Sequence, residues 1–124
     1  MRRIRAATGS PRFAADLARD AEQADAAVVA AFRGIRQITA SEALSKSDYT
    51  VLVNAAGGAV TVTLPAASSV NGQTYIIKKI DASGNAVTID AAGSETIDGA
   101  ATKATTTQWA SYSIQSDGTG WFII

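Results

Sequence analysis

The sequence has no cysteine and no histidine among its 124 residues. Without cysteine, no disulfide stabilises the fold and no thiol chemistry is available. Without histidine, the chain lacks the side chain most often used for acid–base catalysis and metal binding. Aromatic residues are also few, at 6% of the total. These absences argue against an enzyme, and no cofactor is expected.

Long apolar runs are also absent. No stretch approaches the roughly 20 apolar residues that span a bilayer, so no membrane contact is expected. The opening Met-Arg-Arg-Ile-Arg is not followed by the apolar segment of a signal peptide. We therefore expect the chain to stay in the cytoplasm until it is assembled into something larger.

Candidate chemistry is confined to one acidic loop, which contains Asp90, Glu95 and Asp98. Three carboxylates could offer oxygen ligands to calcium, and a pair of them could act as in glycoside hydrolysis. The simpler interpretation is that aspartates before glycine cap turns by accepting hydrogen bonds from nearby backbone. We favour the turn interpretation and expect no metal.

The net charge is zero, but the charges are distributed unevenly. Residues 1–9 form a basic arm, whereas residues 45–124 contain more acidic than basic side chains. Such an arm suits an acidic protein surface or nucleic acid, and we favour a protein partner. The residues expected to anchor it are Arg2, Arg3, Arg5 and Arg12.

Residues 10–36 are predicted to form an amphipathic helix. Ser10 suits the N-cap, Pro11 suits the first helical position, and Gly34 lies near the expected end. Two interpretations stay open: the helix packs on its own β-domain or a neighbour, or it self-associates as a short coiled coil. The predicted packing seam consists of Phe13, Leu17, Ala21, Ala24, Val28, Ala31, Phe32 and Ile35.

After a connector at residues 37–47, with one short strand around Ile38, the apolar period changes to two. Short alternating runs separated by Gly, Asn and Asp predict that residues 48–124 form an antiparallel sandwich or a jelly-roll-like barrel. Residues 58–62 and 85–89 resemble each other, but too briefly to indicate a repeat architecture. The predicted core consists of Val51, Val53, Val60, Val62, Leu64, Ile77, Val87, Ile89, Trp109, Ile114, Trp121 and Ile123.

Three further features concern the surface. Lys78 and Lys79 should face opposite sides of an edge strand, where charge discourages strand pairing. Trp109, Tyr112 and Trp121 could stack on a sugar or base, although in a chain so poor in aromatics we favour a core role. Residues 121–124 are all apolar, so both faces of a terminal strand there should be covered.

A series of short motifs resembles a β-domain of tail-fibre and head-decoration proteins of tailed bacteriophages. The resemblance covers residues 48–124. The motifs, in order, are Tyr49-Thr-Val-Leu-Val53, Gly58-Ala-Val-Thr-Val-Thr-Leu-Pro65, Tyr75-Ile-Ile-Lys-Lys-Ile80, Asn85-Ala-Val-Thr-Ile89, Glu95-Thr-Ile-Asp-Gly99 and Ser116-Asp-Gly-Thr-Gly-Trp121.

The resemblance implies a virion structural module, usually a homotrimer, and supplies no catalytic residues. A long fibre shaft is missing, which favours a short tail fibre or a capsid decoration (cement) subunit held by the N-terminal arm. The implied partners are other copies of the chain, a tail adaptor, nozzle or major capsid protein, and a host-surface receptor. The alternatives are the decoration protein, which stabilises the shell, and a carbohydrate- or receptor-binding adhesin module.

Overall fold

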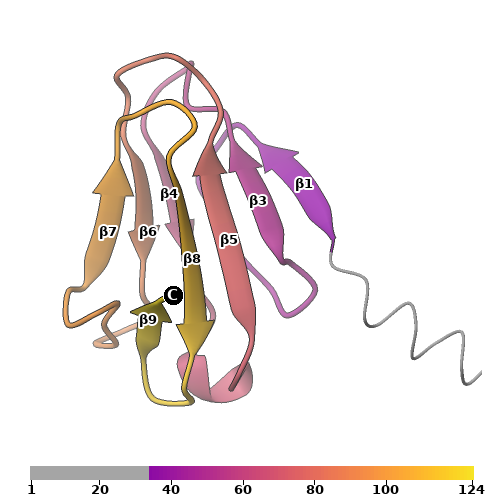
Figure 1. The fold of residues 1–124 in the computed structure, drawn as a ribbon, viewed down its shortest axis with the longest axis vertical. Coiled ribbons are helices and arrows are strands. Elements are labelled where there is room, and N and C mark those ends of the chain that lie inside the picture. Colours follow the sequence, from indigo (N-terminus) through magenta and orange to yellow (C-terminus); the bar gives the residue numbers. More distant parts are fainter. Residues whose placement is uncertain (1–33) are drawn as a thin grey trace, which may run out of the picture. The chain divides into compact units, whose positions relative to one another are not determined.

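A computed structural model describes residues 34–124, which form one compact unit of two β-sheets (Figure 1). One short 3₁₀ helix, η2 (Ala67–Ser69), lies between two of the strands. The strands are β1 (Ile35–Ile38), β2 (Glu42–Ala43), β3 (Thr50–Val53), β4 (Val60–Thr63), β5 (Thr74–Lys79), β6 (Val87–Asp90), β7 (Thr102–Thr105), β8 (Ser111–Ser116) and β9 (Trp121–Ile123).

The first six strands alternate between the two sheets. The five-stranded sheet has the order β1-β3-β5-β8-β9, and the four-stranded sheet has the order β2-β4-β6-β7. Four parallel pairs result, because each of the strands β1 to β4 pairs with the strand two places further along the chain. Only β7, β8 and β9 join by antiparallel pairing. The first six strands thus wind as a coil, with one strand of each turn in each sheet.

The prediction that residues 48–124 form a domain made mostly of β-strands is confirmed. The predicted antiparallel pairing is wrong for the strands of the coil, which pair in parallel with one another. The turn-forming residues between Asn54 and Gly58 lead the chain across to the other sheet, not back beside β3. The two sheets are mixed and form no closed barrel in the described part of the chain, so the barrel alternative is also wrong.

The brief likeness between residues 58–62 and 85–89 marks two successive turns of the coil. Val60 pairs with Val87 and Val62 pairs with Ile89 in the parallel ladder between β4 and β6. In the other sheet, Thr50 of β3 pairs with Ile76 of β5. The two turns are thus offset by 26 residues in one sheet and 27 in the other.

The core lies between the sheets and contains mainly aliphatic side chains. Alternate residues of each strand face inward, as the period of two requires. Of the predicted core, Ile123 is partly buried and Trp109 is 59% exposed, so the prediction for Trp109 is wrong. The buried members of that prediction are Val51, Val53, Val60, Val62, Leu64, Ile77, Val87, Ile89, Ile114 and Trp121.

The β-structure begins earlier than the sequence indicated. Ile35 and Arg36 belong to β1, which pairs in parallel with β3, so the predicted helix cannot extend to residue 36. Ile35 is 66% exposed on this strand and is not part of a helical seam. The arm at residues 1–9, its four arginines and the seam from Phe13 to Phe32 lie outside the described residues.

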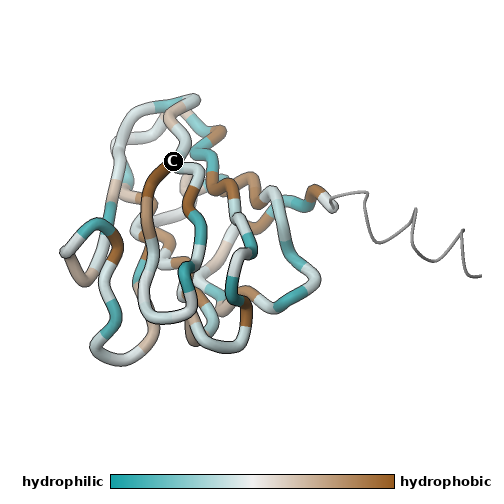
Figure 2. The backbone as a smooth tube through the Cα atoms, turned by 60° about the horizontal axis from the view of Figure 1, so that its bottom comes forward, coloured by the Kyte–Doolittle hydropathy of each residue, from teal (hydrophilic) through white to brown (hydrophobic). Residues whose placement is uncertain are grey.

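The last strand of the chain has one buried and one open face. Trp121 is 1% exposed, whereas Phe122 and Ile124 are 50% and 66% exposed. The apolar character of this end is visible at the C label in Figure 2. Within residues 34–124 nothing covers the second face of β9, so the expected cover would have to come from outside these residues, and it stays a prediction.

Candidate functional site

Two of the three carboxylates of the acidic loop, Glu95 and Asp98, accept hydrogen bonds from the backbone of the domain. Glu95 accepts hydrogen bonds from the backbone N–H of Ala67 at 3.1 and 3.2 Å. Asp98 Oδ1 accepts one from the N–H of Ile123 at 3.1 Å, which holds the free edge of β9. Residues 34–124 contain no group of acidic side chains placed to hold a metal ion, so the calcium interpretation of Asp90, Glu95 and Asp98 receives no support.

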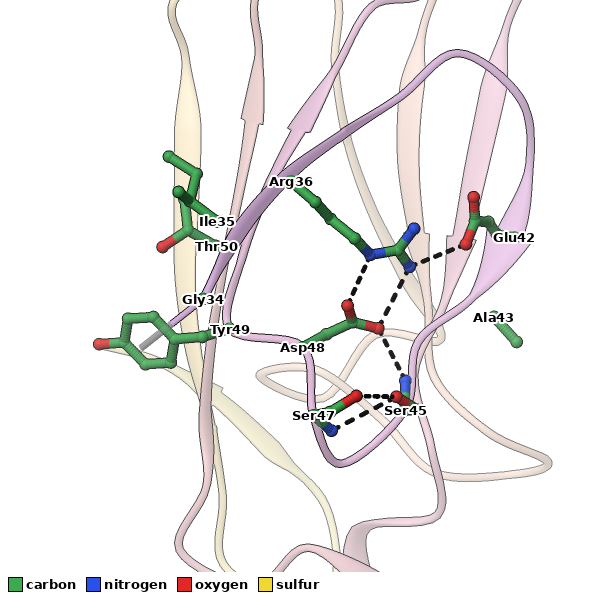
Figure 3. A pocket seen from close by; sticks show the side chains of 10 residues that line it. All are labelled: Gly34, Ile35, Arg36, Glu42, Ala43, Ser45, Ser47, Asp48, Tyr49 and Thr50. Carbon is green, nitrogen blue, oxygen red and sulfur yellow. Dashed lines mark hydrogen bonds and ion pairs between the residues drawn. The ribbon is translucent and has the colours of Figure 1, made fainter. Parts of the chain in front are cut away.

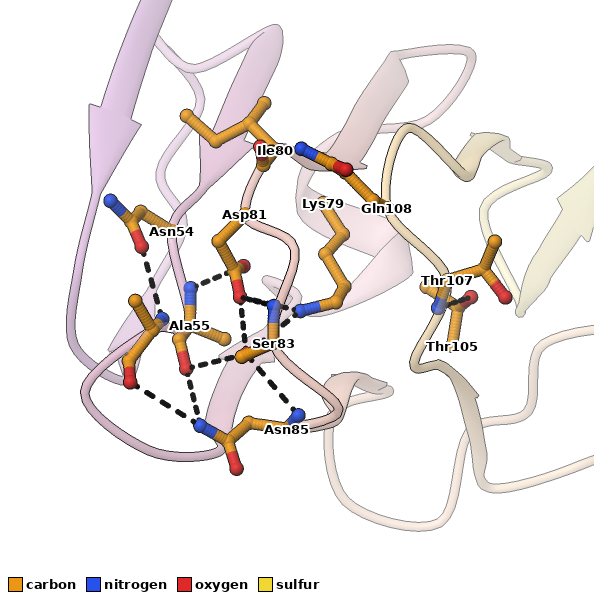
Figure 4. Close-up of polar contacts among 11 residues, drawn as sticks. Asn54, Ala55, Lys79, Ile80, Asp81, Ser83, Asn85, Thr105, Thr107 and Gln108 are labelled. Atoms are coloured by element: carbon orange, nitrogen blue, oxygen red, sulfur yellow. Dashed lines mark hydrogen bonds and ion pairs between the residues drawn. The ribbon is translucent and has the colours of Figure 1, made fainter.

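A buried ion pair lies at the C-terminal end of β5, the middle strand of the five-stranded sheet (Figure 4). Lys79 Nζ lies 2.8 Å from Asp81 Oδ2, and the two side chains are 0% and 6% exposed. Because β5 lies between β3 and β8, the expectation of an edge strand for Lys78 and Lys79 is wrong. The inward direction of Lys79 follows from the alternation along β5, which gives its side chain no route to water.

Asp81 joins the loop after β3 to the loop after β5. Its Oδ1 accepts a hydrogen bond from the Ala55 N–H at 2.7 Å, and its Oδ2 accepts one from the Ser83 N–H at 3.0 Å. Asn85 Nδ2 donates to the Ala55 carbonyl at 2.8 Å. Burial alone raises the pKa of Asp81, but the hydrogen bonds from Lys79, Ser83 and Ala55 outweigh it and hold this pKa well below its usual range. Asp81 is therefore ionised in the folded chain, and its carboxylate holds the two loops together.

A pocket of about 480 Å³ lies at the margin where β1 and β2 face each other (Figure 3). Arg36 of β1 donates from Nε to Asp48 Oδ1 at 2.6 Å and from Nη2 to Glu42 of β2 at 2.8 Å. The bond to Asp48, and then the one to Glu42, raises the pKa of Arg36. Burial raises the pKa of Asp48, but the Arg36 hydrogen bond and the Ser45 N–H lower it overall. The charged side chains of this pocket are thus bonded to one another. The ion pair between Arg36 and Glu42 links the two sheets.

The outward side of the five-stranded sheet is more apolar than that of the four-stranded sheet. All four large apolar side chains that are exposed in the described residues lie on this side or at its end: Ile35, Trp109, Phe122 and Ile124. Residues paired directly across a sheet share a face, so the register defines what we call the apolar face. It comprises Ile35, Gln37, Thr50, Leu52, Thr74, Ile76, Lys78, Ser111, Ser113, Gln115, Phe122 and Ile124, with Trp109 at one end.

Trp109 has a strained backbone at the end of this face. Its φ is +72°, in the left-handed region that a bulky side chain rarely adopts. The N–H of Ala110 donates to the Thr107 carbonyl at 3.2 Å, and the N–H of Trp109 donates to the Lys79 carbonyl at 2.7 Å. Trp109 thus holds the turn and bulge position at which glycine is favoured. Its indole is held outward by Lys78, whose Nζ donates to the Trp109 carbonyl at 3.0 Å and lies 5.9 Å from the ring centroid.

The structure separates the three aromatic residues of the proposed stacking platform. Trp121 is buried against Tyr75, with 5.7 Å between the ring centroids. Tyr112 is partly buried against the core and donates to the Ala104 carbonyl at 3.0 Å. Trp109 alone is exposed, so these residues form no shared platform. Sequence reasoning missed both this exposure and the bonds of Arg36, although the threonines at 105–107 were a signal that Trp109 follows a loop.

Comparison with models of known protein families and with curated proteins finds no match to this chain. Among the described residues, no helix has the length and apolar character needed to cross a membrane.

Proposed function

We propose that this chain is a non-enzymatic structural subunit of a bacteriophage virion, of the short tail-fibre type. In this proposal the residues that precede β1 attach the subunit to the particle, and the β-domain is displayed outside as a homotrimer. The partners are other copies of the chain and a tail adaptor, nozzle or major capsid protein. The motifs across residues 48–124 that resemble phage fibre and decoration domains support this assignment.

One structural observation carries the non-enzymatic part of the proposal: the carboxylates of the domain bind the domain itself. Every aspartate and glutamate in residues 34–124 except Asp90 bonds to the backbone, an arginine or a lysine of the same chain. They are Glu42, Asp48, Asp81, Glu95, Asp98 and Asp117. Groups committed in this way stabilise a scaffold and leave little for acid–base catalysis.

The same molecule fits a capsid decoration subunit, because both roles need an anchor and a stable displayed domain.

Trp109 favours a further candidate, a receptor- or carbohydrate-binding adhesin module. Its indole is 59% exposed although its backbone is strained, and strain of this kind is found at binding sites. The apolar face of a sugar ring packs well on such an indole.

Deletion of residues 1–12 tests the anchoring role. We expect the truncated chain to keep the unfolding midpoint of the full chain and to be missing from purified particles, since a short cationic arm gains order only against a partner. Normal incorporation of the truncated chain would contradict the proposal. Imaging of whole particles then distinguishes a tail position from a position on the capsid shell.

A further inference from the structure

We propose that the apolar face of the five-stranded sheet is the surface through which copies of this chain associate, with a second copy as its occupant. The inference deepens the proposed function, on which it rests for the expectation of a homo-oligomer. It names the surface that joins the copies, which neither the motifs nor the anchor specify.

Apolar side chains alternate with hydroxyl side chains along one row that crosses this face from one margin to the other. The register places Ile35, Thr50, Ile76 and Ser113 in one row across β1, β3, β5 and β8. The N–H of Ile124 donates to the Ser113 carbonyl at 2.8 Å, which places Ile124 at the far end of the same row. An isoleucine thus stands at the centre of the row and at each of its ends, and a hydroxyl side chain separates the central isoleucine from each outer one. Phe122 lies beside Gln115 in the neighbouring row.

The charge of the face favours a second copy over a charged partner. Lys78 is the only ionisable side chain among the outward residues of these strands. Its ammonium already bonds the Trp109 carbonyl and lies beside the indole. A partner with a strongly acidic or basic surface would find almost no complementary charge here. Copies of this face meet with little like-charge repulsion and bury apolar surface on both sides.

Pairing through the β9 edge is blocked, so association at this margin of the sheet would use its face. The N–H of Trp121 donates to the Thr96 carbonyl at 2.9 Å, and the N–H of Asp98 donates to the Trp121 carbonyl at 3.0 Å. Asp98 Oδ1 accepts the N–H of Ile123. An incoming strand would have to displace these bonds before it could pair with β9.

The outward side of the four-stranded sheet provides the contrast. The register gives it the residues Ala43, Thr61, Thr63, Thr88, Asp90, Thr102 and Ala104. Small and hydroxylated side chains of this kind are suited to water. The two outward sides of the sandwich thus differ in apolar character. A monomer with both sides in water has no need of this difference.

The test compares charge substitutions on the two sides of the purified full-length chain. The first variant is Phe122→Glu with Ile124→Glu, and Ile35→Glu provides a second at the opposite margin. The matched control is Thr61→Glu with Ala104→Glu on the four-stranded sheet. Circular dichroism and thermal unfolding establish that each variant is folded, and sedimentation equilibrium across the micromolar range gives its mass.

We expect the wild-type chain to sediment as an oligomer, three times 12.7 kDa for a trimer. Each apolar-face variant should dissociate at concentrations roughly a hundredfold higher than wild type, because carboxylates would be buried without partners, and the control should match wild type. A monomeric wild-type chain, or an oligomer unaffected by both folded apolar-face variants, overturns the inference. An unaffected oligomer overturns the surface alone, whereas a monomeric wild-type chain also removes the homotrimer from the proposed function. The arm deletion tests the anchoring role independently of both results.

Discussion

Lys79 and Asp81 form an ion pair inside the domain, with Nζ and Oδ2 2.8 Å apart and neither side chain more than 6% exposed. Lys79 ends β5 and Asp81 lies in the loop that follows. Asp81 also accepts a hydrogen bond from the N–H of Ala55, 26 residues earlier in the chain. The contact between the two loops therefore depends on the charge of a carboxylate that is almost completely buried.

Replacing one partner of this pair should destabilise the domain strongly. Lys79→Met leaves a carboxylate buried without its cation and should lower the free energy of unfolding by about 3 kcal/mol. Urea unfolding followed by circular dichroism measures the change. Lys78→Met, one residue earlier and facing outward, is the control and should change stability by less than about 1 kcal/mol. Equal effects of the two substitutions would show that the buried pair adds little.

The domain should lose stability in acid. A carboxyl group whose pKa is lower in the folded chain adds stability above its unfolded pKa and loses it as the pH falls. Asp81, Asp48 and Asp117 are in this class; for Asp117 the cause is hydrogen bonds from the N–H groups of Gly120 and Thr119. The free energy of unfolding should therefore be flat above about pH 5 and fall below about pH 4.

The comparison that checks this assignment is Asp81→Asn. This variant should be less stable than wild type near neutral pH, and the difference should shrink as the pH falls through the acid range. Urea midpoints measured at several pH values provide the data. A difference that stays constant with pH would show that Asp81 does not contribute to the acid transition.

Strain at Trp109 predicts different stabilities for two small replacements. Glycine adopts a positive φ without penalty, whereas valine is branched at Cβ and is disfavoured there. Trp109→Gly should thus be more stable than Trp109→Val by about 1–2 kcal/mol. Both variants lose the contact of the indole with Lys78, so the difference reports the backbone. Equal stability of the two would contradict the strained turn.

The terminal strand should depend on Trp121 far more than on Phe122. Trp121→Ala should lower the free energy of unfolding by about 3–5 kcal/mol, and removal of residues 121–124 should give unfolded or insoluble chain. Trp121→Phe should be milder than the alanine variant, because Nε1 has no hydrogen-bond partner among the described residues. Phe122→Ala is the control, with a loss below about 1 kcal/mol at a half-exposed site. A soluble, cooperatively folding truncation would contradict the placement of the core.

The strands themselves could be predicted because the face of a strand residue depends only on its parity. Val51 and Val53, or Val60 and Val62, are two apart and are buried together. The pairing of strands could not be predicted in the same way. Turn residues such as Asn54 indicate where the chain changes direction, but which sheet receives the next strand depends on contacts between residues 26 or 27 apart. The likeness of residues 58–62 to 85–89 was the trace of those contacts.

The errors at Ile35 and Trp109 have a common physical origin. Ile35 follows Ala31 by four residues and so fits a helical seam, but a parallel ladder with β3 determines its conformation. Trp109 is apolar enough for a core, but its turn directs the side chain outward. In both cases tertiary hydrogen bonds override a preference based on the side chain alone. The carboxylate contacts depend on the same long-range pairing and have no local pattern.

The coil of parallel strands has two ends, and different contacts cap each of them in residues 34–124. At one end the Arg36–Glu42 ion pair joins β1 to β2, and at the other the antiparallel strands and Asp98 occupy the β9 margin. Terminal units whose edges are occupied limit the length of repetitive stacks. The bonds at the β9 margin therefore oppose edge-to-edge pairing of copies at that end. A longer version of this module would have to gain whole turns between the caps, with each turn adding one strand to both sheets.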